Sequence, residues 1–221
     1  MNAQMILDSS NGLPIAIVVC LITGYLFGSF PTGYVIGRLH HMDIRDSGSG
    51  NSGTTNALRK MGKMAGLLTF VGDVAKTMIP MLIVRAVLQD NEEFASFMGL
   101  IVGFGAVLGH NFPCWLKFKG GKGIAVTSSV IVLTANIWVT LIGLVLFIAI
   151  VAVTRYVSVG SLMVALLLPI DTYLFYDHDG RWFLPMMIIS ICFTVLAYIR
   201  HAGNIKRLMN GTENKLGQKK A

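Results

Sequence analysis

Charged residues are scarce in this chain. Asp, Glu, Lys and Arg together make up only 13% of its 221 residues, whereas a soluble domain usually carries about 25%. Hydrophobic residues make up 54%, and they fall in long runs of the kind that cross a bilayer. The shortage of charge therefore excludes an ordinary soluble domain and indicates an integral membrane protein with several spans.

Cysteine and the patterns that hold metals are also scarce. Two of the three cysteines, Cys20 and Cys192, lie in apolar runs, and no CxxC or Cys/His cluster occurs. The sequence therefore predicts neither a disulfide framework nor a zinc site. The Walker pattern GxxxxGK[ST] is missing from the glycine-rich stretch, and so is a cluster of metal-binding aspartates. These absences disfavour a nucleotide loop and a CDP-alcohol phosphotransferase, and we expect no cofactor and no metal.

The N-terminal segment has no Lys or Arg before its first apolar run. A cleavable signal peptide would carry a basic region there. We therefore expect this run to be a retained span with its N-terminus outside.

Apolar runs predict seven membrane helices in an all-α protein. The run from Ile124 to Thr154 contains no charge, and as one helix it would be about 45 Å long, more than the hydrocarbon core of about 30 Å. We expect it to break at Thr134-Ala135-Asn136 into a short fourth span and a fifth. The other spans are predicted at Pro14–Leu39, kinked by Pro31, and at Gly66–Leu88, Ala95–Leu108, Val157–Phe175 and Trp182–Ile199.

The distribution of charge supports this topology. With the N-terminus outside, seven spans place every basic segment inside and the acidic turns outside, as the positive-inside rule requires. The basic segments are Arg38–Lys63, Lys117–Lys122, Arg155 and a tail with Arg200, Lys206, Arg207, Lys215, Lys219 and Lys220. The net charge of +7 then needs no nucleic acid partner. We predict one domain over residues 1–221 with a cytoplasmic C-terminus.

Small residues recur four apart in the first and third spans, at Gly24/Gly28 and Gly105/Gly109. This spacing lets membrane helices approach closely. The second span carries Asp73 and Lys76 one turn apart. Charges inside a membrane often mark function, but we favour a paired structural bridge near the cytoplasmic end of the helix.

Three polar segments, 43–65, 109–123 and 200–215, are predicted to share the cytoplasmic face. The first contains DIRDSGSGNSGTTNALR. Its glycines let backbone N–H groups converge, and its Ser, Thr and Asn side chains add donors, which is the chemistry of a phosphate cradle. A flexible linker is the alternative, but Gly53-Thr54-Thr55-Asn56 predicts a helix start. Arg59 and Arg45 could add guanidinium contacts to phosphate oxygens.

The second and third polar segments also contain anion donors. Gly120-Gly121-Lys122-Gly123 permits close backbone approach with Lys122 as the charge, whereas Lys117 and Lys119 are better explained as interfacial anchors. His110 and Asn111 precede this stretch. In the third segment, His201 and Asn204 are three apart and share a face if the last span continues as a helix. A phosphorylated ligand with a lipid chain fits this arrangement.

Two other functions have partial support in the sequence. His41 and Asp46 satisfy the HxxxxD spacing of another acyltransferase class, in which His activates a hydroxyl, but the accompanying acidic motif is missing. A transporter of an organic phosphate, with Asp73 and Lys76 on its path, would show internal repeats and polar residues at mid-membrane. No convincing repeat is found, and the polar residues gather at one face.

The three segments together resemble a known family. GSFPTGYVIGR followed by DIRDSGSGNSGTTNALR, then GHNFPCWLKFKGGKG, then RHAGNIKRL with GTENK, are similar to the three motifs of the bacterial acyl-phosphate-dependent glycerol-3-phosphate acyltransferases, the PlsY family. The resemblance implies a seven-helix bacterial inner-membrane enzyme with a cytoplasmic active site. Such an enzyme transfers a fatty acyl group from acyl phosphate to glycerol 3-phosphate, giving lysophosphatidic acid and phosphate.

The resemblance also assigns roles to residues. Ser49, Arg59 and Lys122 are expected to be catalytic, and a substrate phosphate, not a protein base or a metal, is expected to take the hydroxyl proton. The expected substrate-binding residues are Arg45, Ser49, Gly50, Asn51, Gly53, Thr55, Asn56, Arg59, His110, Asn111, Gly120, Gly121, Lys122, His201, Asn204 and Glu213. Expected partners are acyl phosphate, glycerol 3-phosphate and membrane lipid, with the chain acting as a monomer and with other phospholipid-synthesis enzymes as possible docking partners.

Overall fold

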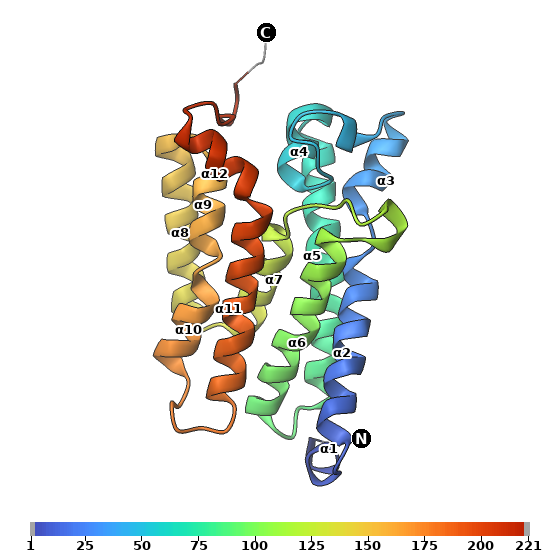
Figure 1. The fold of residues 1–221 in the computed structure, drawn as a ribbon, viewed down its shortest axis with the longest axis vertical. Coiled ribbons are helices and arrows are strands. Elements are labelled where there is room, and N and C mark those ends of the chain that lie inside the picture. Colours follow the sequence, from blue (N-terminus) through green and yellow to red (C-terminus); the bar gives the residue numbers. More distant parts are fainter. Residues whose placement is uncertain (1–2, 219–221) are drawn as a thin grey trace.

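Helices α2, α5 and α6 pack together on one side of the molecule, α8 to α11 form the other side, and α7 lies between them (Figure 1). The computed structural model describes residues 3–218, and this part contains helices and loops but no strand. The helices are α1 (Ala3–Asp8), α2 (Gly12–Gly28), α3 (Thr32–Leu39), α4 (Thr54–Met61), α5 (Lys63–Val87), α6 (Glu92–Asn111), α7 (Ile124–Thr134), α8 (Ile137–Thr154), α9 (Val157–Val164), α10 (Leu167–Phe175), α11 (Phe183–Arg200) and α12 (Ala202–Met209). Two short 3-10 helices cover Ile44–Asp46 and Cys114–Leu116.

Six stretches of the described chain are long and apolar enough to cross a membrane, and α7 is a shorter apolar helix. This confirms the prediction of seven membrane helices with a short fourth one. Three of these stretches contain a break, since α2 runs into α3, α9 runs into α10, and α6 is followed by the 3-10 helix at Cys114–Leu116. The orientation of the termini stays a prediction. Lys219 and Lys220, which the predicted basic tail included, lie outside the described residues.

Two predicted interruptions are confirmed. The first span breaks between Gly28 and Thr32, at Pro31, because proline cannot donate the helical hydrogen bond. The uncharged run breaks between Thr134 and Ile137. There Asn136 caps α8 by accepting a hydrogen bond from Trp138 N at 2.9 Å, while its own N–H donates to the buried Asp171 carboxylate at 2.7 Å.

A third interruption, between α9 and α10, was not predicted. The chain leaves the helix at Ala165 and Leu166. Thr194 on α11 donates its hydroxyl hydrogen bond to Ala165 O at 2.6 Å. A hydroxyl from a neighbouring helix therefore satisfies a carbonyl at the break, and an apolar sequence run gives no sign of this.

The centre of the fold is α6, because most of its apolar length is buried by other helices (78%). A Cβ atom at Gly24 or Gly28 of α2 would overlap the backbone of Val102 or Ala106 on α6. The glycine spacing predicted to bring helices close is therefore confirmed for this pair, and van der Waals contact between the two backbones holds them together.

Asp73 and Lys76 form a buried ion pair of 2.8 Å on α5, as predicted. The Lys76 ammonium also donates to Phe30 O at 2.9 Å and lies 3.0 Å from His110 Nδ1. This pair therefore ties α5 to the break before α3 and to the end of α6. Because the two charges are paired and the ammonium is also hydrogen-bonded, their burial is tolerated.

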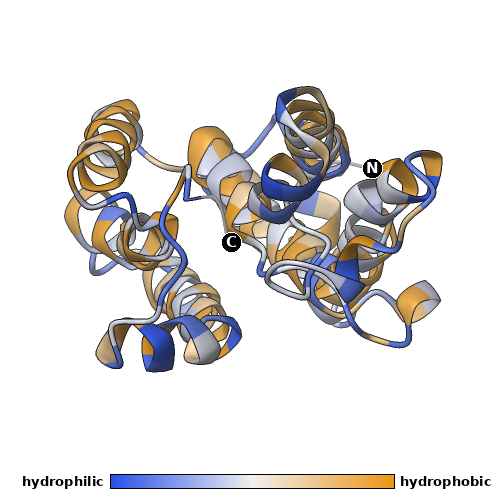
Figure 2. Cartoon of the chain, turned by 90° about the horizontal axis from the view of Figure 1, so that it is seen from above, coloured by the Kyte–Doolittle hydropathy of each residue, from blue (hydrophilic) through white to orange (hydrophobic). Residues whose placement is uncertain are grey.

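The three polar segments lie toward one end of the molecule, with α3, α4, α12 and the C-terminus, while α1 and the turns after α5 and α10 lie at the other (Figure 1). Viewed from that end, hydrophobic residues run along the long helices, and hydrophilic residues concentrate in loops and short helices (Figure 2). The fold thus gathers the polar chemistry on one face, as the sequence predicted.

Candidate active site

The glycine-rich loop before α4 is organised by a single buried side chain, Asn56. Its amide nitrogen lies within hydrogen-bonding distance of three carbonyl oxygens, those of Ile44 at 2.9 Å, Ser47 at 3.1 Å and Asn51 at 2.8 Å. Its Oδ1 atom accepts from Ser49 N at 3.0 Å. The loop therefore wraps around Asn56, whose polar atoms are all used inside the loop.

Glycine is required at Gly48 and Gly50 of this loop. Their φ angles are +65° and +70°, in the left-handed region that L side chains rarely adopt. A Cβ atom at Gly48 would also overlap Oδ1 of Asn56. The glycines at these two positions therefore meet a requirement of the loop backbone.

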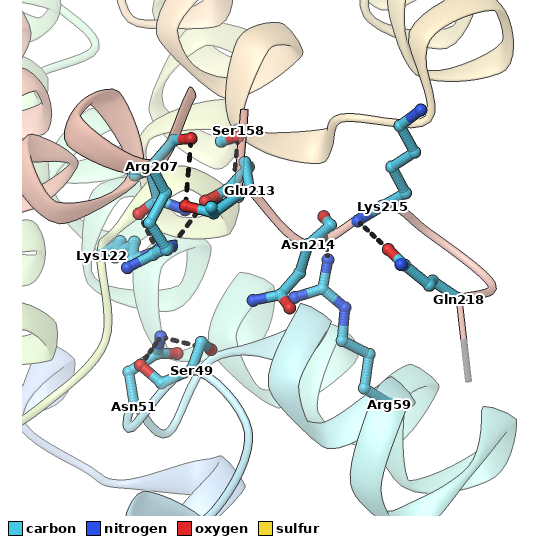
Figure 3. Close-up of polar contacts among 12 residues, drawn as sticks. Ser49, Asn51, Arg59, Lys122, Ser158, Arg207, Glu213, Asn214, Lys215 and Gln218 are labelled. Carbon is cyan, nitrogen blue, oxygen red and sulfur yellow. Dashed lines mark hydrogen bonds and ion pairs between the residues drawn. The ribbon is translucent and has the colours of Figure 1, made fainter. Parts of the chain in front are cut away.

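Two side-chain donors on α4 have no hydrogen-bond partner among residues 3–218. Gly53 is the N-cap residue and supplies no side-chain cap. The Thr54 hydroxyl and the Arg59 Nε atom are buried without a hydrogen-bond partner. Unused donors at a helix N-terminus, together with the helix dipole, form an anion site. Asn51 lies beside them and donates to Ser49 Oγ at 2.9 Å (Figure 3).

The second and third polar segments meet at Lys122. Its ammonium donates a 2.5 Å hydrogen bond to Asn204 Oδ1. Asn204 in turn donates to Glu213 Oε1 at 2.6 Å, an oxygen that also accepts from Ser158 at 3.0 Å. Arg207 completes the network with a 2.7 Å ion pair to Glu213 (Figure 3). Burial lowers the pKa of Lys122 to about 8, because low polarity disfavours the charged amine.

Glu213 stays ionised at the centre of this network. Burial by itself raises the pKa of a carboxyl group, but the hydrogen bonds from Asn204, Arg207 and Ser158 outweigh it and lower the pKa of Glu213. The ionised carboxylate neutralises Arg207 and fixes the amide of Asn204. As a result, the Asn204 oxygen points toward Lys122.

His201 lies at the junction between α11 and α12, and it is neutral at physiological pH. Burial lowers its pKa to about 4. Its Nδ1 atom is 2.8 Å from Ala197 O. Because a carbonyl only accepts, the Nδ1 atom carries the proton, and Nε2 is the acceptor of the ring. A neutral imidazole with a free acceptor suits a hydroxyl ligand.

A cavity of about 460 Å³ brings the three polar segments together. Its polar part is lined by Ser49, Asn51, Gly53, Thr54, Thr55, Arg59, Asp73, His110, Lys122, Ser158, His201, Asn204, Arg207, Glu213 and Asn214. Its apolar part extends between α7, α8 and α9 and includes Ile131, Leu144, Phe147, Val164 and Leu167. One continuous space therefore joins an anion site to a groove suited to a hydrocarbon chain.

The cavity carries an excess of positive charge. Its two carboxylates, Asp73 and Glu213, are each paired with a cation. Arg59 and Lys122 line the same space, and neither forms a salt bridge within residues 3–218. Arg59 instead donates to Asn214 O at 3.2 Å (Figure 3). Two cations without carboxylate partners provide the electrostatic attraction for phosphorylated ligands.

Ten of the predicted binding residues line the cavity and six do not. The ten are Ser49, Asn51, Gly53, Thr55, Arg59, His110, Lys122, His201, Asn204 and Glu213. The six are Arg45, Gly50, Asn56, Asn111, Gly120 and Gly121. Among the latter, Arg45 pairs with Asp43 at 2.6 Å and donates to Leu116 O at 3.2 Å. In this structure Arg45 therefore contacts Asp43 and the Leu116 carbonyl and does not line the cavity, and its expected role in closing the cradle stays a prediction.

Sequence reasoning missed Thr54, Ser158, Arg207 and Asn214 as lining residues. Arg207 was counted only in the basic tail, and its spacing of three from Asn204 was the available signal. Ser158 lies near the start of the predicted span Val157–Phe175, where nothing in the sequence marked it as polar lining. His41 and Asp46 are not among the lining residues, so the HxxxxD reading gains no support. No three His, Cys, Asp or Glu side chains in the described chain come together to hold a metal ion.

Sequence comparisons with known proteins identify the family that this chain resembles. The family model described as glycerol-3-phosphate acyltransferase matches residues 18–211. A glycerol-3-phosphate acyltransferase of Clostridioides difficile is 40% identical, covering 92% of this chain and 97% of the relative. One of Staphylococcus saprophyticus is 41% identical, covering 90% and 98%.

Comparison with solved structures points to the same family. The crystal structure of PlsY (YgiH), an integral membrane glycerol 3-phosphate acyltransferase, in its glycerol 3-phosphate form has a TM-score of 0.80 and 32% identity, covering 91% of this chain and 96% of that one. Its lysophosphatidic acid form has a TM-score of 0.76. The similarity thus extends over nearly the whole length in sequence and in fold, and this chain belongs to the glycerol-3-phosphate acyltransferase family of integral membrane acyltransferases.

Proposed function

We propose that this chain transfers a fatty acyl group from acyl phosphate to the sn-1 hydroxyl of glycerol 3-phosphate, giving lysophosphatidic acid and inorganic phosphate. The observation that carries the proposal is the single cavity, which joins a cationic polar end to an apolar groove. Acyl phosphate has both parts, and glycerol 3-phosphate needs only the polar end. The two crystal structures of PlsY (YgiH), one in a glycerol 3-phosphate form and the other in a lysophosphatidic acid form, support the same pair of ligands.

In this proposal, the first polar segment holds the phosphate of the acyl donor. Ser49 and Thr55 line the cavity beside the uncapped first turn of α4, where N–H groups and the helix dipole favour an anion. The acyl chain then extends into the groove between α7 and α8. Donors placed around the leaving phosphate stabilise the charge that develops on it as the bond to the acyl carbon breaks.

Glycerol 3-phosphate would lie on the opposite side of the cavity. Arg59 and Lys122 provide its phosphate with positive charge, and His201 Nε2 and Asn204 orient the hydroxyl. The hydroxyl oxygen forms a bond to the acyl carbon, the bond from that carbon to the phosphate oxygen breaks, and inorganic phosphate leaves. The pKa of a phosphate monoanion is about 6, so a substrate phosphate is a competent acceptor for the hydroxyl proton. Positioning and charge stabilisation then supply the catalysis.

We further propose that the active site faces the cytoplasm of a bacterial inner membrane and that one chain suffices. The basic residues around the cavity favour the cytoplasmic side under the positive-inside rule. All of the lining residues described above come from a single chain. Light scattering of the active detergent-solubilised protein tests the monomer, and labelling of an introduced cysteine at exposed Lys206 in intact cells tests the orientation.

The decisive experiment supplies purified protein with palmitoyl phosphate and glycerol 3-phosphate in the presence of a metal chelator. We expect lysophosphatidic acid by mass spectrometry and an equal amount of released phosphate. The Lys122→Met variant controls for the spontaneous reaction. Absence of lysophosphatidic acid would refute the proposal. Activity with acyl coenzyme A alone would change the donor, and activity only after metal addition would remove the metal-free mechanism.

A further inference from the structure

Arg200, the last residue of α11, uses its guanidinium group on backbone carbonyls. Its Nε atom donates to Gly121 O at 3.2 Å, and one terminal nitrogen donates to Gly121 O at 2.8 Å and to Gly120 O at 3.3 Å. The group also lies over the ring of Phe112, 5.0 Å from its centroid. Arg200 forms no salt bridge with any residue in 3–218, and it does not line the cavity. Its hydrogen bonds are therefore committed to one loop.

The other side of the same loop is held by the end of α6. Gly121 N donates to His110 O at 3.0 Å, and Gly120 N donates to Asn111 O at 3.2 Å. A Cβ atom at Gly121 would overlap the His110 ring, and one at Gly120 would overlap His110 O. The His110 ring itself contacts Lys76. The two glycines are thus held through their N–H groups from one side and through their carbonyls from the other.

Lys122 follows this doubly held pair directly. Its ammonium bonds Asn204, which lies four residues after Arg200 across the junction of α11 and α12. One short stretch of the third polar segment therefore fixes both the backbone before Lys122 and the far end of its side chain. A displaced loop would move the ammonium within the cavity even if every lining side chain were kept.

We propose that Arg200 is a positioning residue, which holds the carbonyls of Gly120 and Gly121 so that Lys122 meets the substrate phosphate. This inference rests on the proposed function, because it concerns how the same site is kept in order. A planar guanidinium suits the task, since it directs several N–H donors in fixed directions toward two adjacent carbonyls. A lysine at this position could not direct them in the same way.

The test uses the full-length Arg200→Ala variant in the lysophosphatidic acid assay. We expect kcat to fall by about tenfold to 100-fold, which is the cost of a displacement of roughly 1 Å in a catalytic group. The Km for acyl phosphate should stay near that of the wild type, because the first polar segment is untouched. Added guanidinium ion at low millimolar concentration should restore part of kcat, and Arg200→Lys should be intermediate.

Arg181→Ala is the matched control. Arg181 is exposed, and its cation lies over the Trp182 ring next to the predicted outer turn. This variant should keep wild-type kcat and show no response to guanidinium. The proposal is overturned if Arg200→Ala keeps wild-type kcat, or if its loss accompanies a lowered melting temperature and guanidinium does not restore it. A wild-type protein that makes no lysophosphatidic acid would instead refute the proposed function.

Discussion

Lys122 Nζ lies 2.5 Å from Asn204 Oδ1, and this hydrogen bond joins the loop before α7 to the first turn of α12. The two residues are 82 positions apart. Asn204 is itself fixed by Glu213, so the ammonium is held toward the cavity by a chain of buried partners. Removing one member of such a network is expected to affect the others.

Replacing Lys122 by methionine should remove most of the activity. The substitution keeps the length of the side chain and removes its charge, and loss of one such donor commonly costs about 10² to 10³ in kcat. The rate of lysophosphatidic acid formation by the purified variant measures this loss of activity. Lys119→Met is the control, because Lys119 is exposed and lies outside the cavity. Equal rates for both variants and the wild type would mean that Lys122 does not act on the substrate.

The affinity for glycerol 3-phosphate should fall as the pH rises through about 8. This is the pKa to which burial lowers Lys122, and an amine must keep its proton to attract an anion. The Km for glycerol 3-phosphate should therefore increase above pH 8. In Lys122→Arg this increase should disappear, since arginine stays charged. Initial rates of the wild type and of Lys122→Arg over a pH series show whether the Km rises only in the wild type.

The same lowered pKa has the opposite effect on stability. Between pH 8 and the ordinary lysine pKa of about 10.4, the unfolded chain binds a proton that the folded protein does not, so this group makes stability rise with pH in that range. We expect the ligand-free wild type to gain melting temperature relative to Lys122→Met across this interval. A difference between the two proteins that does not change with pH would contradict the assignment.

Asn56→Ala should disorganise the first polar segment without touching the ligand directly. Asn56 does not line the cavity, yet it contacts three carbonyls and one N–H of the loop. Each buried group left without a partner costs about 1–3 kcal/mol. We expect a raised Km for acyl phosphate together with a lower melting temperature. Asn56→Asp should also fail, since it keeps the acceptor but loses the donors. Wild-type kinetics in both would show that the loop holds its shape by other means.

Gly28→Ala should destabilise the protein, and Gly99→Ala should not. A Cβ atom at Gly28 would overlap the Ala106 backbone, which cannot move aside within α6, whereas at Gly99 the nearest atom is 3.6 Å away. Overpacking of this kind typically costs about 1–3 kcal/mol. Melting temperatures in one detergent compare the two variants. Similar values would mean that α2 and α6 are not held by close backbone contact.

The sequence allowed the membrane helices and most of the polar lining to be predicted, because both follow local rules. Charge-free runs mark spans, and proline marks a kink. The break after α9 was missed, since the hydroxyl that satisfies Ala165 O belongs to α11. Arg207 and Ser158 were missed for the same reason. Their carboxylate partner, Glu213, comes from a loop whose path was not predictable.

By itself, the sequence determined that this is a helical membrane protein with three polar segments suited to phosphate, since composition and residue type decide which groups are present. Only the tertiary structure decided which of these groups face the cavity. Arg45 and Asn56 have the right chemistry for a ligand, but Asn56 spends its hydrogen bonds within the loop and Arg45 spends its own on Asp43 and on Leu116 O. In the sequence, Arg200 directly follows the last predicted span. In the structure it joins the end of α11 to the glycine loop, and its partner there, the Gly121 carbonyl, could not be predicted from spacing. Contacts between segments about 80 residues apart depend on how the helices pack, and local sequence patterns do not determine that packing.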